Sequence, residues 1–311
     1  MANRKSGFVA IIGRPNAGKS TLLNAVLGTE LSIVTPKAQT TREKVLGIHT
    51  EKQGQIVFMD TPGIHKAKPG GINEYMVTEA RDALDSPSLI WYMVDPKSAL
   101  FHEAAVIDLL AQSRSPLILI LNKMDLGKND PFEAELVASL NAKNIKVSGV
   151  FKISALKKKG VRELLVETWR HIPHGELFYP DEEQLSDRPT RFFVGEKVRE
   201  QLYRQLGEEL PYSCAVEIEL FDEKVKPPRI EAVIHVERES QKGIIIGKGG
   251  LKIKEIGKAA RAEIEKFMGT HVFLGLKVKV LKEWTRDAQA LERMGYHFTK
   301  PGKKSSRNRT S

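Results

Sequence analysis

Short, uninterrupted apolar runs recur through the first half of the chain and alternate with segments of helical periodicity. The runs at 8–12, 89–94 and 117–121 contain no charged residue, which is typical of strands covered on both faces of a sheet. The other expected strands are a hairpin of 44–49 with 55–59 and a strand at 147–153. The expected helices are 19–27, 104–112, 132–140 and 161–172. This alternation predicts an α/β fold with a mostly parallel sheet and helices on both faces.

A different pattern begins in the second half. Three prolines and an acidic run between residues 173 and 190 predict a linker. Beyond it we expect a helix at 191–206, alternating strands at 216–220 and 232–236, a glycine-rich turn at 243–250, a helix at 251–268, a strand at 271–281 and a helix at 284–294. With a helix-like segment before the turn, the order α-β-β-α-α-β predicts an α+β domain. We therefore expect a first domain at 5–172, a linker at 173–190, a second domain at 191–298, and a basic, disordered tail at 299–311.

Charge is distributed unevenly along the chain. The net charge is +10, yet residues 242–311 alone hold 17 Lys and Arg against 6 Asp and Glu, so the rest is nearly neutral. This asymmetry indicates a polyanionic partner at the C-terminal end, either nucleic acid or an anionic membrane surface, although a solvated basic face would look the same. The single cysteine, Cys214, excludes an internal disulfide, and no apolar run approaches the ~18 residues of a membrane span. We therefore expect a cytoplasmic location.

A phosphate-binding motif follows the first apolar run. Gly13-Arg-Pro-Asn-Ala-Gly-Lys-Ser20 fits G-x-x-x-x-G-K-[ST] and lies between a predicted strand and a predicted helix. Backbone N–H groups of such a loop turn toward phosphate, the lysine reaches the β and γ oxygens, and the serine hydroxyl ligates Mg²⁺. The expected nucleotide contacts here are Gly13, Asn16, Ala17, Gly18, Lys19, Ser20 and Thr21.

Three further motifs stand at predicted strand ends. In Asp60-Thr-Pro-Gly63, the aspartate can hold Mg²⁺ through water and Gly63 can offer its N–H to the γ-phosphate. In Asn122-Lys123-Met-Asp125, the carboxylate can accept hydrogen bonds from guanine N1–H and its 2-amino group, which adenine cannot donate. The small residues of Ser154-Ala155-Leu156 can let the backbone approach guanine O6.

These four motifs, in this order, resemble a translation-factor-class GTPase domain. The resemblance implies that Thr41, with Thr40 as the alternative, coordinates Mg²⁺ and closes over the γ-phosphate, and that 36–43 and 63–71 are the two switches. It implies catalytic roles for Lys19, Thr41 and Gly63. Ile64 stands where Ras-like enzymes have a water-orienting glutamine, so the catalytic charge must come from elsewhere. GTPases with this substitution and an asparagine at the position of Asn16 often use K⁺, which implies K⁺-stimulated hydrolysis.

The motif Gly247-Lys248-Gly249-Gly250 and its flanking elements resemble a KH domain. In that fold a G-x-x-G loop clamps the backbone of about four single-stranded nucleotides. Lys248 in the loop and Lys252 one turn later can meet phosphates. The row Lys254, Lys258 and Arg261 lies at helical spacing and is more typical of a solvated face.

A GTPase domain followed by a KH domain, with Lys37-Ala-Gln-Thr-Thr-Arg42 between the first two motifs, resembles the bacterial Era family of GTPases over nearly the whole chain. The resemblance implies GTP and GDP binding, Mg²⁺, and a monomer. It further implies binding of the single-stranded 3′ end of 16S rRNA and a role in assembly of the 30S ribosomal subunit. Family members are also found at the inner face of the cytoplasmic membrane. The alternative hypothesis is a nucleotide-gated membrane adaptor of the cell cycle whose basic end binds lipid.

Overall fold

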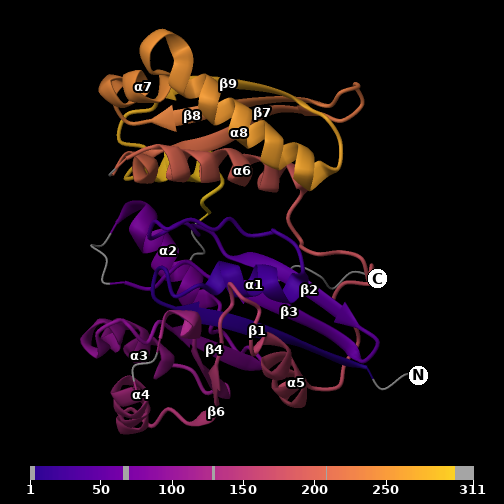
Figure 1. Ribbon diagram of the computed structural model, residues 1–311, viewed down its shortest axis with the longest axis vertical. Coiled ribbons are helices and arrows are strands. Elements are labelled where there is room, and N and C mark those ends of the chain that lie inside the picture. Colours follow the sequence, from indigo (N-terminus) through magenta and orange to yellow (C-terminus); the bar gives the residue numbers. More distant parts are fainter. Residues whose placement is uncertain (1–3, 66–69, 128–129, 208, 298–311) are drawn as a thin grey trace.

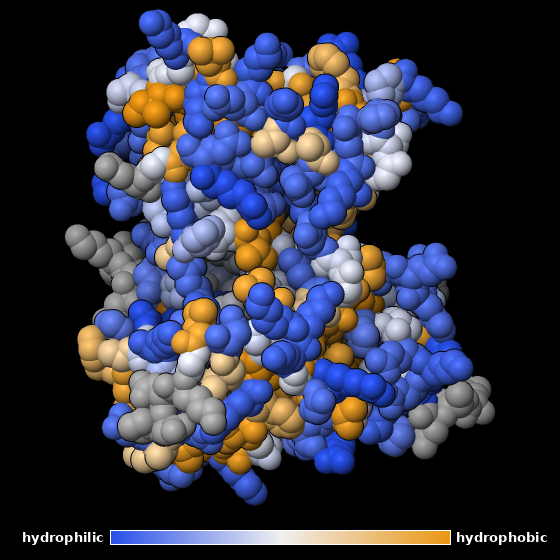
Figure 2. Space-filling model, in the orientation of Figure 1, coloured by the Kyte–Doolittle hydropathy of each residue, from blue (hydrophilic) through white to orange (hydrophobic). Residues whose placement is uncertain are grey.

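The fold consists of two lobes stacked along the long axis of the molecule (Figure 1). The computed structural model describes residues 4–65, 70–127, 130–207 and 209–297. The first lobe holds a six-stranded sheet and the second a three-stranded sheet. Figure 2 shows a largely hydrophilic face on both lobes, with apolar atoms visible at the waist between them. The predicted tail at 299–311 lies outside the described residues.

The sheet of the first lobe has the strand order β2-β3-β1-β4-β5-β6. All neighbours are parallel except β2 and β3, which form the predicted antiparallel hairpin. The carboxyl ends of β1, β3, β4, β5 and β6 therefore meet at one edge of the sheet. The strands are β1 (Lys5–Gly13), β2 (Val45–Glu51), β3 (Gly54–Asp60), β4 (Leu89–Val94), β5 (Leu117–Leu121) and β6 (Val147–Lys152).

Helices cover both faces of this sheet, as predicted. The central strands β1 and β4 are buried on both sides, because Ile12 and Tyr92 pack toward one apolar cluster and Ile11 and Trp91 toward another. The first cluster lies under α2, α3 and α4, and the second under α1 and α5. The helices are α1 (Lys19–Leu27), α2 (Gly71–Asp82), α3 (Ala104–Leu110), α4 (Asp130–Ala142) and α5 (Val161–His171). Sequence analysis did not predict α2.

The second lobe has the predicted order α-β-β-α-α-β. Strand β8 lies between β7, which is antiparallel to it, and β9, which is parallel. One apolar cluster joins the sheet to its three helices, with Val198, Ile234, Ile245 and Ile256 all fully buried. The elements are α6 (Thr190–Gln205), β7 (Ala215–Asp222), β8 (Arg229–Val236), α7 (Glu239–Ile246), α8 (Leu251–Met268) and β9 (Phe273–Val280).

Two boundaries in this lobe differ from the predictions. The expected glycine turn at 243–250 is shorter, because residues 243–246 continue α7 and only the last four residues form the loop. The expected helix at 284–294 shrinks to α9 (Ala288–Arg293), because Asp287 caps its N-terminus by accepting a hydrogen bond from the Ala290 N–H.

The segment predicted as a linker is packed along the first sheet. Ser6 donates its N–H to the Pro173 carbonyl, and Ile48 donates its N–H to the Leu185 carbonyl, both at 2.9 Å. No helix among the described residues combines the length and apolarity needed to cross a membrane.

Candidate functional site

The phosphate loop joins the end of β1 to the start of α1. Both of its glycines sit where a side chain would collide: a Cβ on Gly13 would lie 2.2 Å from the Met93 carbonyl oxygen, and one on Gly18 would lie 2.3 Å from the Asn122 side-chain nitrogen. Gly18 also has φ +102°. The loop therefore closes against the ends of β4 and β5, and α1 begins with its N-terminus directed at the turn.

Lys19 is buried inside this loop. The residue is only 6% exposed. Its Nζ donates hydrogen bonds to the carbonyl oxygens of Gly13 at 3.1 Å and Arg14 at 3.0 Å. Burial lowers the pKa of the Lys19 ammonium to about 8, although Asp60 and Glu103 oppose the shift. A cation held in place and partly desolvated is suited to an anionic ligand such as phosphate.

Because phosphate would keep Lys19 protonated, we expect nucleotide binding to take up protons in alkaline solution. The pKa of free Lys19 is about 8, so below that value the ammonium is already charged and no proton is needed. At about pH 8.5 most free molecules carry neutral Lys19, and binding should take up most of one proton and weaken as the pH rises further. Calorimetry in buffers of different ionisation heat measures this uptake. Equal heats in all buffers at that pH would contradict the assignment.

Three oxygen-bearing side chains meet beside Lys19. Ser20 Oγ donates to Asp60 Oδ2 at 2.7 Å and lies 3.0 Å from Thr41 Oγ1. Asp60 is fully buried, burial raises its pKa, and its Oδ1 has no hydrogen-bond partner among the described residues. Hard divalent cations prefer oxygen ligands, and this cluster offers them an unpartnered carboxylate oxygen. The donor set therefore fits Mg²⁺.

The structure distinguishes the two threonines of the first switch. The Thr40 hydroxyl donates to the Lys37 carbonyl at 2.8 Å and lies 2.7 Å from Thr35 Oγ1, so it is held within its own loop. Thr41, the first choice of the sequence analysis, is the one that reaches Ser20.

The motifs expected to hold the base also come together. Ser154 Oγ donates to Asp125 Oδ1 at 2.6 Å, and this bond is the main cause that lowers the pKa of the exposed Asp125 carboxyl. Asn122 donates to the Ala17 carbonyl at 2.8 Å and accepts from the Ala155 N–H at 2.9 Å, which ties three motifs together. Lys123 Nζ lies 2.9 Å from Asp95 Oδ2, and Leu156 is 71% exposed beside them.

The second switch begins against the phosphate loop. A Cβ on Gly63 would lie 2.5 Å from the Pro15 Cα, and the N–H of Ile64 donates to the Gly13 carbonyl at 3.1 Å. The Ile64 side chain is only 4% exposed and packs into the apolar cluster of the sheet, so it faces away from the phosphate cavity. Residues 66–69 of this switch lie outside the described residues.

Sequence analysis missed Gln39. It adopts φ +56° and lines a cavity of about 60 Å³ together with Lys19, Thr41 and Gly63. Its Nε2 lies 2.8 Å from His65 Nε2, and His65 Nδ1 lies 3.1 Å from the Gly63 carbonyl. The amide thus connects the two switches at the phosphate end of the site. The available signal was its place in the run 37–42, two residues before Thr41.

The G-x-x-G loop lies between α7 and α8 in the second lobe. Gly247, Gly249 and Gly250 have φ of +71°, +59° and +78°, which explains why glycine is required at these positions. Lys248 is exposed, whereas Lys252 Nζ lies 3.2 Å from Glu255 Oε2. Ile244 and Leu251, 59% and 64% exposed, flank the loop with apolar surface. The loop can therefore present backbone N–H groups, one free cation and apolar contacts to a nucleic-acid strand.

Comparison with known proteins agrees with this geometry. A family model described as a 50S ribosome-binding GTPase matches residues 8–123, and a KH-domain model matches residues 209–285. The GTPase Era of Carboxydothermus hydrogenoformans is 42% identical over 94% of this chain and 98% of its own, and that of Xylella fastidiosa is 42% identical over 94% and 97%.

Two solved structures share both lobes. Era in complex with MgGDPNP and nucleotides 1506–1542 of 16S ribosomal RNA superimposes with a TM-score of 0.88 at 37% identity, covering 95% of this chain and 100% of that one. An Aquifex aeolicus Era variant bound to GDP·AlF4⁻ gives 0.87 at 37% identity, covering 94% and 100%. With two relatives at 42% identity over almost their full length and the same two-lobed fold, this chain belongs to the Era family of GTPases.

Proposed function

We propose that this chain is a GTP-controlled RNA-binding protein that binds the single-stranded 3′ end of 16S rRNA and assists assembly of the 30S subunit. The observation that carries the proposal is the union, in one chain, of the Ser20, Asp60 and Thr41 oxygen cluster with a G-x-x-G loop on a KH fold. The similar Era structure that holds both MgGDPNP and 16S rRNA nucleotides supports it over 95% of the chain.

In the GTPase reaction, the residues of the first lobe bind and orient the nucleotide. Lys19 and the backbone of residues 13–21 hold the phosphates, and Gly63 offers its N–H to the γ-phosphate. Ser20, Thr41 and Asp60 would hold Mg²⁺, which neutralises charge on the β and γ oxygens when bound. Thr41 belongs to the first switch, so a bound γ-phosphate would hold it beside Ser20, and loss of the γ-phosphate on hydrolysis would release the switch.

Guanine recognition falls to Asp125. Its carboxylate is already oriented by Ser154 and stays ionised because its pKa is lowered. Asn122 holds the phosphate loop and the Ala155 backbone in register. The backbone of Ser154, Ala155 and Leu156 would approach the O6 atom of the base.

We also propose that K⁺ stimulates hydrolysis through Asn16. Asn16 stands on the phosphate loop, and its Nδ2 donates to the Pro36 carbonyl of the first switch at 3.0 Å. Its amide oxygen is the atom that would ligate the cation. A monovalent cation at that position would supply positive charge beside the phosphates. Such a charge is needed because the buried Ile64 cannot orient the attacking water as a glutamine would. We expect faster GTP hydrolysis in K⁺ than in Na⁺ at equal ionic strength, and loss of that difference in Asn16→Ala. Equal rates of the unmodified chain in both salts would refute the K⁺ proposal.

A binding assay tests the RNA proposal against the membrane alternative. We expect the full chain, a monomer, to bind a single-stranded oligomer matching the 16S rRNA 3′ end more tightly than a scrambled oligomer of equal length, because the KH loop holds splayed single strands. The second arm is sedimentation with anionic liposomes. Binding to liposomes without preference between the oligomers would contradict the proposal and favour peripheral membrane attachment. We also propose a cytoplasmic location, because the proposed partner is the RNA of the ribosomal small subunit.

A further inference from the structure

Arg42, the residue that follows Thr41, is buried in the second lobe. The chain leaves the oxygen cluster at Thr41, and the next side chain is only 4% exposed. Its guanidinium reaches five acceptors of the KH lobe: the carbonyl oxygens of Cys214 at 2.7 Å, Tyr212 at 2.8 Å and Pro211 at 3.2 Å, and the hydroxyls of Tyr203 at 3.2 Å and Tyr296 at 3.5 Å.

Aromatic rings complete this binding site for the guanidinium. The Arg42 Cζ lies 5.7 Å from the centroid of Trp284 and 5.9 Å from that of Tyr203. No carboxylate forms an ion pair with Arg42 in the part of the chain that the structure describes. The positive charge of Arg42 is therefore stabilised by carbonyl dipoles and ring faces. These contacts are directional, so they hold the planar guanidinium in one position.

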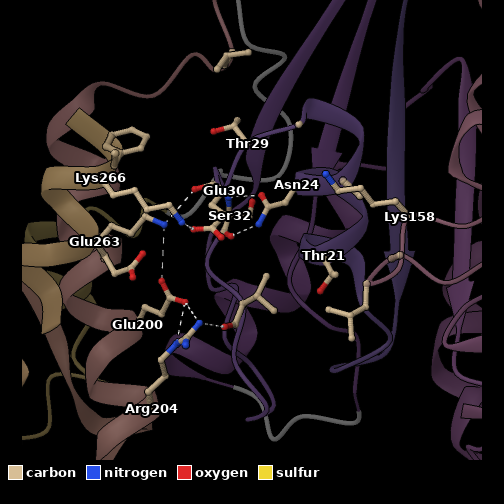
Figure 3. A pocket seen from close by; sticks show the side chains of 18 residues that line it. Thr21, Asn24, Thr29, Glu30, Ser32, Lys158, Glu200, Arg204, Glu263 and Lys266 are labelled. Atoms are coloured by element: carbon tan, nitrogen blue, oxygen red, sulfur yellow. Dashed lines mark hydrogen bonds and ion pairs between the residues drawn. The ribbon is translucent and has the colours of Figure 1, made fainter. Parts of the chain in front are cut away.

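The segment before the first switch also contacts the KH lobe, through more exposed groups. Lys266 and Glu30 form an ion pair at 3.0 Å with both side chains at least 60% exposed, and Arg204 donates to the Val34 carbonyl at 3.3 Å (Figure 3). These residues line an open cavity of about 670 Å³ between the lobes. Exposed ion pairs contribute little to holding two bodies together. Two other residues of the first switch also contact the KH lobe: Lys37 donates to the Leu206 carbonyl, and the Gln39 carbonyl accepts from the Tyr203 hydroxyl at 3.3 Å. Both are only half-buried, whereas Arg42 is buried.

We propose that Arg42 is the positioning residue that couples the GTP state of Thr41 to the placement of the KH domain. Consecutive Cα atoms are about 3.8 Å apart, so Thr41 cannot move far from Ser20 while Arg42 stays in its site. In this arrangement Thr41 lies at Ser20 and Arg42 lies among its five acceptors at the same time. A γ-phosphate that closes Thr41 thus favours this interdomain arrangement, and the arrangement favours closure of Thr41.

This inference rests on the proposed function, because its main readout is nucleotide-dependent RNA affinity. The coupling ratio is the Kd for RNA with GDP divided by the Kd with a non-hydrolysable GTP analogue. Allosteric couplings of ordinary size give ratios of about 5 to 150. We expect Arg42→Ala to bring the ratio close to one and leave GDP-state RNA affinity unchanged, because the G-x-x-G loop is intact. Arg42→Lys, which keeps the charge but not the fork, should restore part of the ratio.

Hydrolysis gives a second readout. Thr41 contributes when the γ-phosphate is bound, so Arg42→Ala should lower kcat with little change in the KM for GTP. The matched control is Arg191→Ala, since Arg191 is an exposed arginine of α6 whose side chain donates to the Ile218 carbonyl within the KH lobe. Arg191→Ala should keep both the ratio and kcat. A wild-type ratio in Arg42→Ala would overturn the inference.

A distance measurement separates this inference from the proposed function. Dyes attached through Glu163→Cys on α5 and Glu223→Cys after β7 report the separation of the lobes, because one dye lies on each lobe. The native Cys214 is fully buried and is not labelled. We expect energy transfer to differ between the GTP analogue and GDP, and Arg42→Ala to remove the difference even if RNA affinity proves independent of nucleotide. No nucleotide-dependent change in the unmodified chain, by either readout, would overturn the inference. If Arg42→Ala no longer unfolds cooperatively, it is not properly folded, and Arg42→Lys replaces it as the test. An intermediate coupling ratio in Arg42→Lys supports the inference, and a wild-type coupling ratio refutes it.

Discussion

Asp125→Asn should exchange the guanine preference of this GTPase for a xanthine preference. The Asp125 carboxylate accepts from Ser154 and is free to accept two further bonds from guanine N1–H and the 2-amino group. An asparagine offers one donor and one acceptor, which matches xanthine and leaves a guanine donor unpaired. Two charge-assisted bonds of about 1.5–3 kcal/mol each correspond to a change of roughly 10²- to 10⁴-fold in relative affinity.

Competition of GTP, XTP and ATP against a fluorescent nucleotide measures this change. Asp108→Asn is the control, because Asp108 lies on α3 and pairs at the surface with Lys143. It should leave the ranking of nucleotides unchanged. Retention of the guanine preference in Asp125→Asn would show that the base lies elsewhere.

Lys248→Asp combined with Gly249→Asp should remove most of the RNA affinity while leaving GTP hydrolysis intact. Both positions are exposed at the tip of the G-x-x-G loop, where RNA phosphates would approach the main chain. The change removes one cation and adds two anions, and Gly249 has φ +59°, which a side chain rarely adopts. We expect a loss of about two orders of magnitude in RNA affinity and a weaker dependence of the remaining binding on salt.

The control for this variant carries the same charge change at another left-handed residue. Asn144→Asp with Lys146→Asp alters the exposed loop before β6, and Asn144 has φ +58°. RNA affinity should be unchanged in this pair. Equal losses in both variants would mean that only net charge matters and that the KH loop is not the RNA site.

Local patterns predicted most of the fold. The strands β4 and β5 were predicted at their observed bounds, because both faces are covered and the apolar run coincides with the strand. Helix α2 was missed because its apolar face is completed by residues distant in the sequence. Ile72 and Tyr75 pack in one cluster with Trp284 and Tyr296 of the other lobe, so the burial of that face follows from the arrangement of the two lobes.

The same distinction applies to the site. Motif residues such as Lys19, Ser20 and Asp125 are recognisable because the spacing of each motif carries its chemistry. Arg42 has no such signal, since its partners Tyr203 and Tyr296 lie 161 and 254 residues away along the chain. Only the folded chain shows that the side chain of Arg42, next to the switch threonine, is buried against the KH lobe.

The central claim is that GTP controls RNA binding by this chain. The most direct test is the affinity of the full chain for an oligomer matching the 16S rRNA 3′ end, measured with a non-hydrolysable GTP analogue and with GDP, and with a scrambled oligomer as control. The geometry predicts tighter, sequence-dependent binding with the analogue, because Thr41 and the KH lobe are joined through Arg42. Equal affinity in both nucleotide states would contradict the claim of a GTP-controlled switch.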